Sequence, residues 1–461
     1  MRQGFSEEPS IEPQIQAIDD GSTSTRLDAP SPNNKKASKP TSKQHNVIIQ
    51  PRLRPMPFKL QDIPPPALPV PTKVQTVNGV SYFQVEDLPV NRRGFKYKLC
   101  RPNPLFTSNF YSTTDLSPYQ ACVSLFDRSS GILFSQDSMS VTSPQGWRSA
   151  RSNVGIREGS YYFEFKILNA DENSHVRVGV ARREASLEAP VGYDAYGYGI
   201  RDVDGELMFI SRRKNVCVEN GFTTGDVVGF LIELPSLKEH KREIREFVES
   251  KTAEISTQHQ AKKKKTKWKQ NTVEQNEIFN AHDNIVRDQI PTKSKGALYY
   301  DQYEYTKTKT MDHLLNPITV FGEKAVIEMD DKTKNIPVIA NSRIRVFKNG
   351  VEQDSCIDNL YSFLPTNIEE REDLNLEPNV QQQQNPGYRN TDDSTLGYYP
   401  MLSTFQNGAV RLNAGPDFEF PPPEPVKPLN DRYEEQVIEE WYWDVLDEVE
   451  AQYLDSFDDD N

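Results

Sequence analysis

Cysteine is scarce in this chain of 461 residues, and its spacing excludes several classes of protein. No two cysteines form a CxxC pair, so neither a zinc finger nor the disulfide framework of a small secreted domain is expected. Histidine is also sparse, with six residues scattered along the chain and no HExxH, P-loop or GxSxG motif. We therefore expect no metal site, no cofactor and no enzymatic activity of the chain itself. The four cysteines are Cys100, Cys122, Cys217 and Cys356.

Long apolar runs and an excess of positive charge are missing as well. No stretch approaches the ~18 apolar residues of a membrane helix, and the polar start at residues 1–4 is unlike a signal peptide. We expect a soluble intracellular protein without membrane contact. A net charge of -13 argues against a dedicated nucleic-acid binder. With 36% hydrophobic residues and 33 prolines, mostly outside the strand-like segments, the chain can bury one sizeable core but is not expected to be globular throughout.

The chain does contain segments in which apolar and polar residues alternate with a period of two. In residues 161–167, one face consists of Tyr161, Phe163, Phe165 and Ile167, which predicts a half-buried strand. In residues 175–180 the three valines take the buried side and leave Arg177 on the other. Residues 196–201 repeat the pattern, with Tyr196, Tyr198 and Ile200 alternating with two glycines and Arg201.

The face that carries Arg177 and Arg201 is a candidate binding surface. Gly179 and Gly199 are expected to leave backbone exposed and to give room on this face, and guanidinium groups pair carboxylates in a bidentate geometry. The loop at residues 188–194 adds a stiff proline and an aromatic rim. These features favour a groove for an extended acidic peptide. The alternative is an ordinary solvated sheet face, in which the glycines mark bulges or bends.

Turn signals at short spacing predict a mainly β fold, an antiparallel β-sandwich. The dipeptides at residues 204–205, 349–350 and 407–408 read Asp-Gly or Asn-Gly, and strand-like segments flank each of them.

The sandwich is expected to span residues 76–425, with two long insertions at about 236–337 and 367–395. Connections of that length are too long for an ordered bare loop in a compact domain. Residues 297–305, inside the first insertion, look like a strand, whereas residues 1–75 have the composition of a disordered region.

Several short segments match a known family. They read GWRSAR at 146–151, VGIREGSYYFE at 154–164, VRVG at 176–179, APVGYD at 189–194 and YGIR at 198–201. The chain resembles the SPRY-domain subunit of the COMPASS, or SET/MLL-type, histone methyltransferase complexes, the Ash-two-like family, over roughly residues 90 to 455. Animal members carry a zinc-binding PHD-type finger before this domain. No cysteine precedes Cys100, so a fungal-type member without that finger is expected.

The resemblance implies a peptide pocket on the surface described above. In that family the pocket receives a short acidic segment of the WD-repeat propeller subunit. Its lining positions correspond here to Trp147, Arg177, Pro190, Tyr193 and Arg201. Position 147 is a tyrosine in animal members; tryptophan keeps the flat apolar face but replaces the hydroxyl with an indole N–H donor.

A non-catalytic role in the nucleus is also implied by the resemblance. Together with the propeller subunit, a protein of this family orders and activates the SET-domain methyltransferase subunit, which modifies a lysine near the start of the histone-three tail. Contact with the nucleosome is then expected through the complex. The alternative is a SPRY-type peptide-binding adaptor in another complex, such as a ubiquitin ligase. That class needs a RING or a cullin-box segment, and the chain resembles neither.

Residues 433–454 have the periodicity of an amphipathic helix. Acidic residues cover most of its surface and leave one apolar stripe, made of Ile438, Trp441, Tyr442, Val445 and Val449. Such a helix can dock on its own SPRY core. In the family that the chain resembles, the terminal helix instead binds the groove of a small helical dimer, the Dpy-thirty or Sdc-type subunit, through anchors at i, i+3, i+4 and i+7.

One dense cationic run lies inside the first insertion. It consists of Lys262, Lys263, Lys264, Lys265, Lys267 and Lys269. We interpret it as a nuclear-import signal or a solvated loop, with weak electrostatic contact to DNA as a further alternative.

Overall fold

The computed structural model describes residues 68–92, 94, 96–99, 117–262, 291–301, 304–305, 311, 314, 319–320, 323–324, 336–354, 357–365, 388–389, 392–423 and 425–458. All of them belong to the second of two compact units, which spans Pro51–Asn461. Predictions for residues 1–67, for most of the second insertion and for Lys263, Lys264, Lys265, Lys267 and Lys269 lie outside the described residues.

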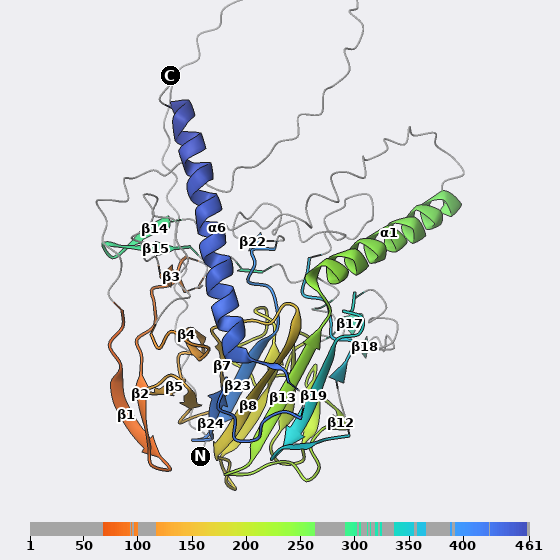
Figure 1. The fold of residues 1–461 in the computed structure, drawn as a ribbon. Helices are drawn as coiled ribbons and strands as arrows, with labels where there is room; N and C mark the ends of the chain where they lie inside the picture. The colour runs from red at the N-terminus through yellow and green to blue at the C-terminus, as the bar shows by residue number, and fades with distance from the viewer. Residues whose placement is uncertain are drawn as a thin grey trace, which may run out of the picture. The chain divides into compact units, whose positions relative to one another are not determined.

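Two largely antiparallel sheets pack face to face in the described residues, which confirms the predicted β-sandwich (Figure 1). The first sheet has 11 strands. Its main path, in spatial order, is β1 (Thr72–Val77), β2 (Val80–Gln84), β5 (Leu133–Ser135), β6 (Ser140–Thr142), β24 (Ala409–Asn413), β8 (Gly159–Asn169), β13 (Val227–Leu234), β19 (Arg343–Lys348) and β20 (Val351–Glu352); β21 (Ile357–Asp358) pairs with β19, and β25 (Lys427–Pro428) pairs with β8. Strand β1 starts inside the segment predicted to be disordered.

The second sheet has seven strands in the described residues and carries the candidate surface. In spatial order they are β12 (Arg212–Val216), β11 (Glu206–Phe209), β10 (Gly197–Arg201), β9 (His175–Ala181), β23 (Tyr399–Phe405), β7 (Arg148–Ser152) and β4 (Val123–Arg128). Because β9 lies between β10 and β23, residues more than 200 positions apart in the sequence, such as Arg177 and Ser403, become neighbours at the centre of this sheet.

The core between the sheets is built from the alternating residues that the sequence predicted. Phe163 and Phe165 of β8 pack against Phe230 of β13 with ring centroids 5.7 and 5.3 Å apart. From the opposite sheet, Val176 and Val178 are fully buried in the same cluster. The predicted inward faces of both strands are therefore confirmed.

The predicted hairpin turns also form. Gly205 has φ +67°, and Asn349 and Gly350 have φ values of 47° and 80°. Asn407 follows with a φ of 66° in the turn between β23 and β24. A left-handed backbone conformation has little energetic cost for glycine, and its cost for asparagine is smaller than for most other residues. Asn-Gly and Asp-Gly dipeptides therefore predict such turns.

The first insertion begins with α1 (Leu237–Lys262), a helix that is not predicted from the sequence. The helix is rich in charged residues but has a narrow apolar stripe. Two residues of this stripe, Ile244 and Val248, are buried in the core cluster. His240 is buried beside them, with Nε2 2.7 Å from Ser362 Oγ. Burial lowers the pKa of His240 to about 3, so the imidazole is neutral.

Small sheets complete the described part. The strand expected within residues 297–305 is present as two strands, β15 (Ala297–Tyr300) and β16 (Glu304–Tyr305). Strand β15 pairs with β14 (Pro291–Ser294) on one side and with β3 (Lys98–Leu99) on the other. Strand β16 pairs with β22 (Tyr388–Arg389), and β17 (Thr319–Val320) pairs with β18 (Glu323–Lys324).

The terminal helix α6 spans Leu429–Asp458, and its first turns dock on the sandwich. Leu429 and Tyr433 are buried in the core cluster. Arg432 donates from Nε to the carbonyl oxygen of Gly155 at 3.1 Å, and Tyr161 of β8 donates to the Glu435 carboxylate at 2.5 Å. The rest of α6 continues past the sheets (Figure 1). No helix among the described residues is long and apolar enough to span a membrane.

Candidate peptide-binding pocket

Arg177 and Arg201 lie directly opposite each other on neighbouring antiparallel strands. Arg177 of β9 pairs in register with Arg201 of β10 and, on its other side, with Ser403 of β23. Like charges at directly opposed positions repel each other across a sheet. The outer face therefore holds two guanidinium groups whose proximity is favourable only when anions compensate them.

Trp147 joins this pair from the residue that precedes β7. The Arg177 guanidinium carbon lies 5.3 Å from the centroid of the Trp147 ring, within the range of a cation–π contact. The same ring packs against Phe405 with centroids 5.4 Å apart. The indole therefore forms an apolar wall next to the charged group.

The loop between β9 and β10 forms the other wall with a tight turn. The backbone N–H of Tyr193 donates to Pro190 O at 3.0 Å, and Gly192 between them has φ +81°, as in a type II turn. Arg177 donates from Nη1 to Val191 O at 3.2 Å, which places this turn beside the arginine. The Tyr193 side chain is 44% exposed at the rim.

The glycines of β9 and β10 do not open the surface, so that expectation was wrong. Gly179 and Gly199 are buried. A Cβ on Gly199 would lie 2.3 Å from Val191 O, and one on Gly179 would lie 1.9 Å from Tyr198 O. Glycine is required at position 199 because the loop packs directly on the strand backbone. The accessible part of the face lies at the arginine end of the strands.

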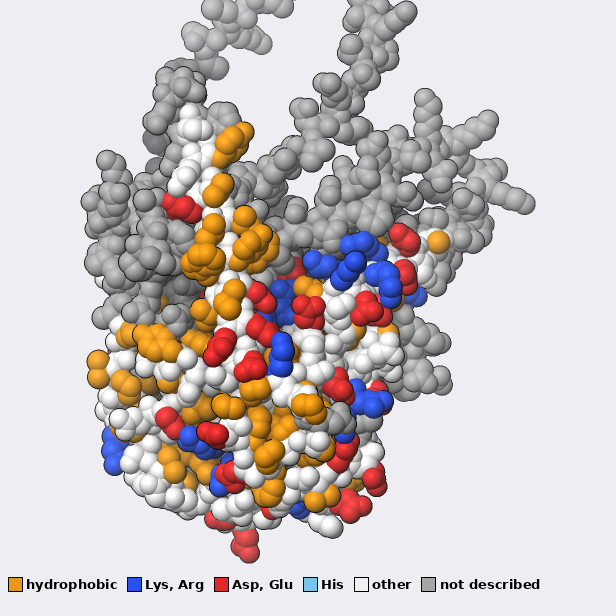
Figure 2. All heavy atoms as spheres, in the orientation of Figure 1, with side chains coloured by type: hydrophobic (Ala, Val, Ile, Leu, Met, Phe, Trp, Pro, Cys, Tyr) orange, Lys and Arg blue, Asp and Glu red, His pale blue; other side chains and the backbone are white. Residues whose placement is uncertain are grey.

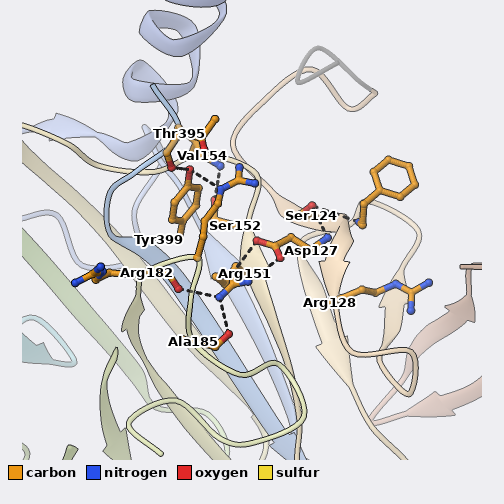
Figure 3. A network of polar contacts seen from close by, with 12 residues as sticks. Ser124, Asp127, Arg128, Arg151, Ser152, Val154, Arg182, Ala185, Thr395 and Tyr399 are labelled. Carbon is orange, nitrogen blue, oxygen red and sulfur yellow. Dashed lines mark hydrogen bonds and ion pairs between the residues drawn. The ribbon is translucent and has the colours of Figure 1, made fainter. Parts of the chain in front are cut away.

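A buried ion pair fixes the start of the same loop (Figure 3). Arg151 of β7 donates from Nε and Nη2 to the two carboxylate oxygens of Asp127, each at 2.8 Å. Its Nη1 donates to Arg182 O at 2.8 Å and to Ala185 O at 3.0 Å. Burial raises the pKa of Asp127, but the Arg151 guanidinium outweighs burial and holds this pKa at about 2. The charged network therefore holds residues 182–185, at the start of the loop, against β7.

Arg177 is poorly compensated in this arrangement. Its Nε is buried and has no hydrogen-bond partner among the described residues. Burial lowers the pKa of Arg177 to about 10, and repulsion from Arg201 contributes in the same direction. The group stays protonated near neutral pH, so a bound carboxylate would relieve both effects.

Arg201 is already in contact with acidic side chains. Its Nη1 lies 3.3 Å from Asp204 Oδ2 and 3.8 Å from Glu206 Oε2. Arg213 of β12 reaches the same two carboxylates, with Nε 3.2 Å from Glu206 Oε2 and Nη1 4.0 Å from Asp204 Oδ2. The two acids therefore lie between two arginines.

Several of these residues were not predicted from the sequence. Ser403 and Phe405 share a face of β23 by the period of two, which is the signal that could have found them. Asp204 and Glu206 lie in and just after a predicted turn, where their charge was not considered. His175, which shares a face with Arg177, contacts Asp202 with Nδ1 2.9 Å from Oδ2.

The apolar stripe of α6 forms a second exposed surface. Figure 2 shows hydrophobic side chains gathered along this helix beyond its docked turns. Val445 is half-buried. The other predicted interface residues are mostly exposed, with exposed fractions of 65% for Ile438, 49% for Trp441, 55% for Tyr442 and 60% for Val449. The stripe is therefore not covered by the sandwich. The predicted lysine run lies elsewhere in the chain, and of its residues the structure describes only Lys262, the last residue of α1.

Comparison with known proteins identifies the family of this chain. A family model described as SPRY domain matches residues 160–237, from within β8 to the start of α1, which confirms the SPRY-type fold. Over 424 residues the chain is 32% identical to "COMPASS component cclA" of Colletotrichum higginsianum, covering 80% of this chain and 69% of that protein. The chain belongs to the Ash-two-like family.

Two further relatives support this membership. The chain is 31% identical to "Set1 complex component ash2" of Schizosaccharomyces pombe over 87% of its own length and 52% of that protein. It is 29% identical to "COMPASS component BRE2" of Saccharomyces cerevisiae over 81% of its own length and 90% of that protein. The chain thus spans about half of the fission-yeast relative and most of the budding-yeast one.

Proposed function

We propose that the chain is a non-catalytic scaffold and activating subunit of a COMPASS-type histone-lysine methyltransferase complex in the nucleus. The family membership supports this assignment, because the relatives are named as components of COMPASS or Set1 complexes. The partner subunits in this proposal are the WD-repeat propeller, the SET-domain methyltransferase and the Dpy-thirty or Sdc-type helical dimer. The methylated residue is the lysine near the start of the histone-three tail.

In this proposal the pocket at Trp147, Arg177, Pro190, Tyr193 and Arg201 binds an acidic segment of the propeller subunit. One observation carries it: the buried Nε of Arg177 has no partner among the described residues, on a surface flanked by an aromatic wall. A carboxylate that approaches the guanidinium group adds a charge-assisted hydrogen bond and compensates its charge, and the flat ring of Trp147 packs against the peptide beside it. An ordinary solvated arginine would leave no buried donor to satisfy.

The terminal helix supplies the second interface. The exposed stripe from Ile438 to Val449 follows the spacing of a helix that lies in an apolar groove. Its docked first turns hold the helix on the SPRY core while the stripe stays accessible. A small helical dimer with a hydrophobic groove matches this surface. The lysine run that starts at Lys262 is proposed to serve nuclear import or weak contact with nucleosomal DNA.

Affinity purification of the full chain from its native cells, followed by mass spectrometry, tests the assignment. We expect the propeller, SET-domain and small dimeric subunits to co-purify in comparable amounts. Recovery of a RING or cullin subunit in their place would support the adaptor function and overturn ours. Methyltransferase assays should show no turnover by the isolated chain and a rise in turnover when it is added to the other subunits.

A further inference from the structure

The two arginines of the pocket differ in their electrostatic surroundings. Arg177 contacts a backbone carbonyl and an aromatic ring, and its Nε has no partner within the described part of the chain. Arg201 lies within 4 Å of two carboxylates, those of Asp204 and Glu206. A pocket of two equivalent arginines would bind two carboxylates equally well. Among the described residues no carboxylate lies within 4 Å of the Arg177 guanidinium, although Asp202 and Asp204 act on it from farther away, whereas Arg201 has two carboxylates within that distance.

The two internal carboxylates lie close enough to Arg201 to compete with a ligand. Glu206 Oε2 is buried and has no hydrogen-bond partner among the described residues, although Arg213 Nε lies 3.2 Å away as an ion-pair partner. If a ligand carboxylate took Arg201, both acids would keep their ion pairs with Arg213. The exchange is therefore feasible, but each new contact replaces an existing one and the net gain is small.

We propose that Arg177 is the anchoring site for a single carboxylate of the partner segment and that Asp204 and Glu206 act as built-in competitors at Arg201. This inference rests on the proposed function of the pocket and specifies the ligand that the pocket selects. One obligatory carboxylate must reach Arg177. Further acidic residues in the segment contribute little, because they meet a guanidinium that is already paired.

The chemistry of the segment follows from this asymmetry. Next to the anchoring carboxylate it should carry an apolar residue that packs on Trp147, whose ring lies against Arg177. An unbroken acidic run is not needed, and Asp204 and Glu206 would repel it. The competitors therefore disfavour binding of unrelated polyanions to this partly buried pair of arginines.

Titration of the purified propeller subunit onto the full chain tests the inference. The variants are Arg177→Gln, Arg201→Gln and the double variant Asp204→Asn with Glu206→Gln. Asparagine at 204 keeps the oxygen that accepts the Glu206 backbone N–H, so the turn is retained. Glu219→Gln is the matched control, because Glu219 is exposed and lines a neighbouring cleft of ≈ 860 Å³ with Asp204. Thermal melting checks the fold of every variant.

We expect Arg177→Gln to weaken binding about 10- to 100-fold and Arg201→Gln only about 2- to 5-fold. The double variant should tighten binding about 3- to 10-fold, and Glu219→Gln should leave it within about twofold. In the Arg201→Gln background the tightening should disappear, as a double-mutant cycle would show.

Two results separate the inference from the function on which it rests. Weaker binding by Arg177→Gln, with no tightening in the double variant beyond that of Glu219→Gln, overturns the inference and leaves the pocket in place. Wild-type affinity in both arginine variants overturns the pocket itself and the inference with it.

Discussion

The backbone N–H of Val191 donates to the Ser403 hydroxyl at 2.9 Å, a bond that connects the pocket loop to β23, the neighbour of the central strand of the second sheet. Ser403 also accepts a hydrogen bond from the Ser149 hydroxyl at 2.8 Å. Its hydroxyl thus connects β7, β23 and the loop that contains Pro190 and Tyr193. The position of the loop beside Arg177 therefore depends on a residue that is itself fully buried.

Substitution of Ser403 by alanine should therefore loosen the loop without removing any pocket residue. The Val191 N–H would stay buried without an acceptor, which costs about 1–3 kcal/mol of stability. Urea unfolding should show that loss, and hydrogen exchange should rise at residues 188–196. Ser174→Ala removes an exposed hydrogen bond to Gln406 O and serves as the control, with an expected change within about 0.5 kcal/mol. Equal effects of both variants would contradict this role of Ser403.

Acid should weaken the loop through Asp127. Its pKa of about 2 in the folded state lies below the ordinary value near 3.8, so its contribution is fully present above about pH 4 and is lost as the pH falls toward 2. The contribution is about 2 kcal/mol. Stability measured from pH 5 to pH 2 should fall less steeply in Asp127→Asn, which has no carboxyl to protonate, although this variant is less stable at neutral pH. Parallel curves would show that the ion pair with Arg151 does not set the acid sensitivity.

Glycine should be required at position 192 for two reasons, its left-handed backbone and the lack of space for a Cβ. A second glycine with the same backbone but with free space distinguishes them. An alanine there would meet the left-handed φ of +81° and place its Cβ 2.2 Å from Met208 O. Gly225 has a φ of +96°, but a Cβ at that position would have nothing within 4 Å, so Gly225→Ala reports the backbone cost alone. We expect about 1 kcal/mol for Gly225→Ala and at least about 2–3 kcal/mol for Gly192→Ala. The latter alone should reduce binding of the propeller subunit.

We expect two parts of the terminal helix to have different roles: its first turns stabilise the fold, and its exposed stripe binds a partner. Tyr433→Ala removes a buried ring and should cost about 3 kcal/mol of stability. Combined replacement of Trp441 and Tyr442 by alanine should leave the melting temperature nearly unchanged, because both side chains are about half exposed. Gel filtration with the small helical dimer should then show loss of that partner and retention of the propeller subunit. Loss of stability in the double variant would mean that the stripe belongs to the core.

The β-sandwich could be predicted because local alternation in residues 161–167 and 175–180 determines which side chains are buried. The turns at Gly205 and Gly350 followed from backbone preferences alone. Long-range relationships could not be predicted in this way. The pairing of Arg177 with Ser403 depends on the order of the strands in the sheet. Helix α1 is stabilised by packing of an apolar stripe that is too narrow to be recognised among the charged residues of the sequence.

The glycines show the same limit within the pocket. Their pattern indicated a special backbone, but only the structure shows that the loop covers Gly199 rather than leaving it open. The acids at 204 and 206 were visible in the sequence, yet their effect depends on the distance from Arg201, which periodicity does not give.

Photo-cross-linking from the rim of the pocket tests whether an acidic segment of the propeller subunit occupies it. A photoreactive benzoylphenylalanine replaces the exposed Tyr193 in the full chain, and the same residue replaces the exposed Tyr119 as a control. After irradiation with the propeller subunit, mass spectrometry maps the cross-linked peptides. We expect position 193 to capture a segment of the propeller that contains acidic residues, and we expect no such product from position 119. A complex that still forms but gives no such product at position 193 would show that the segment binds elsewhere.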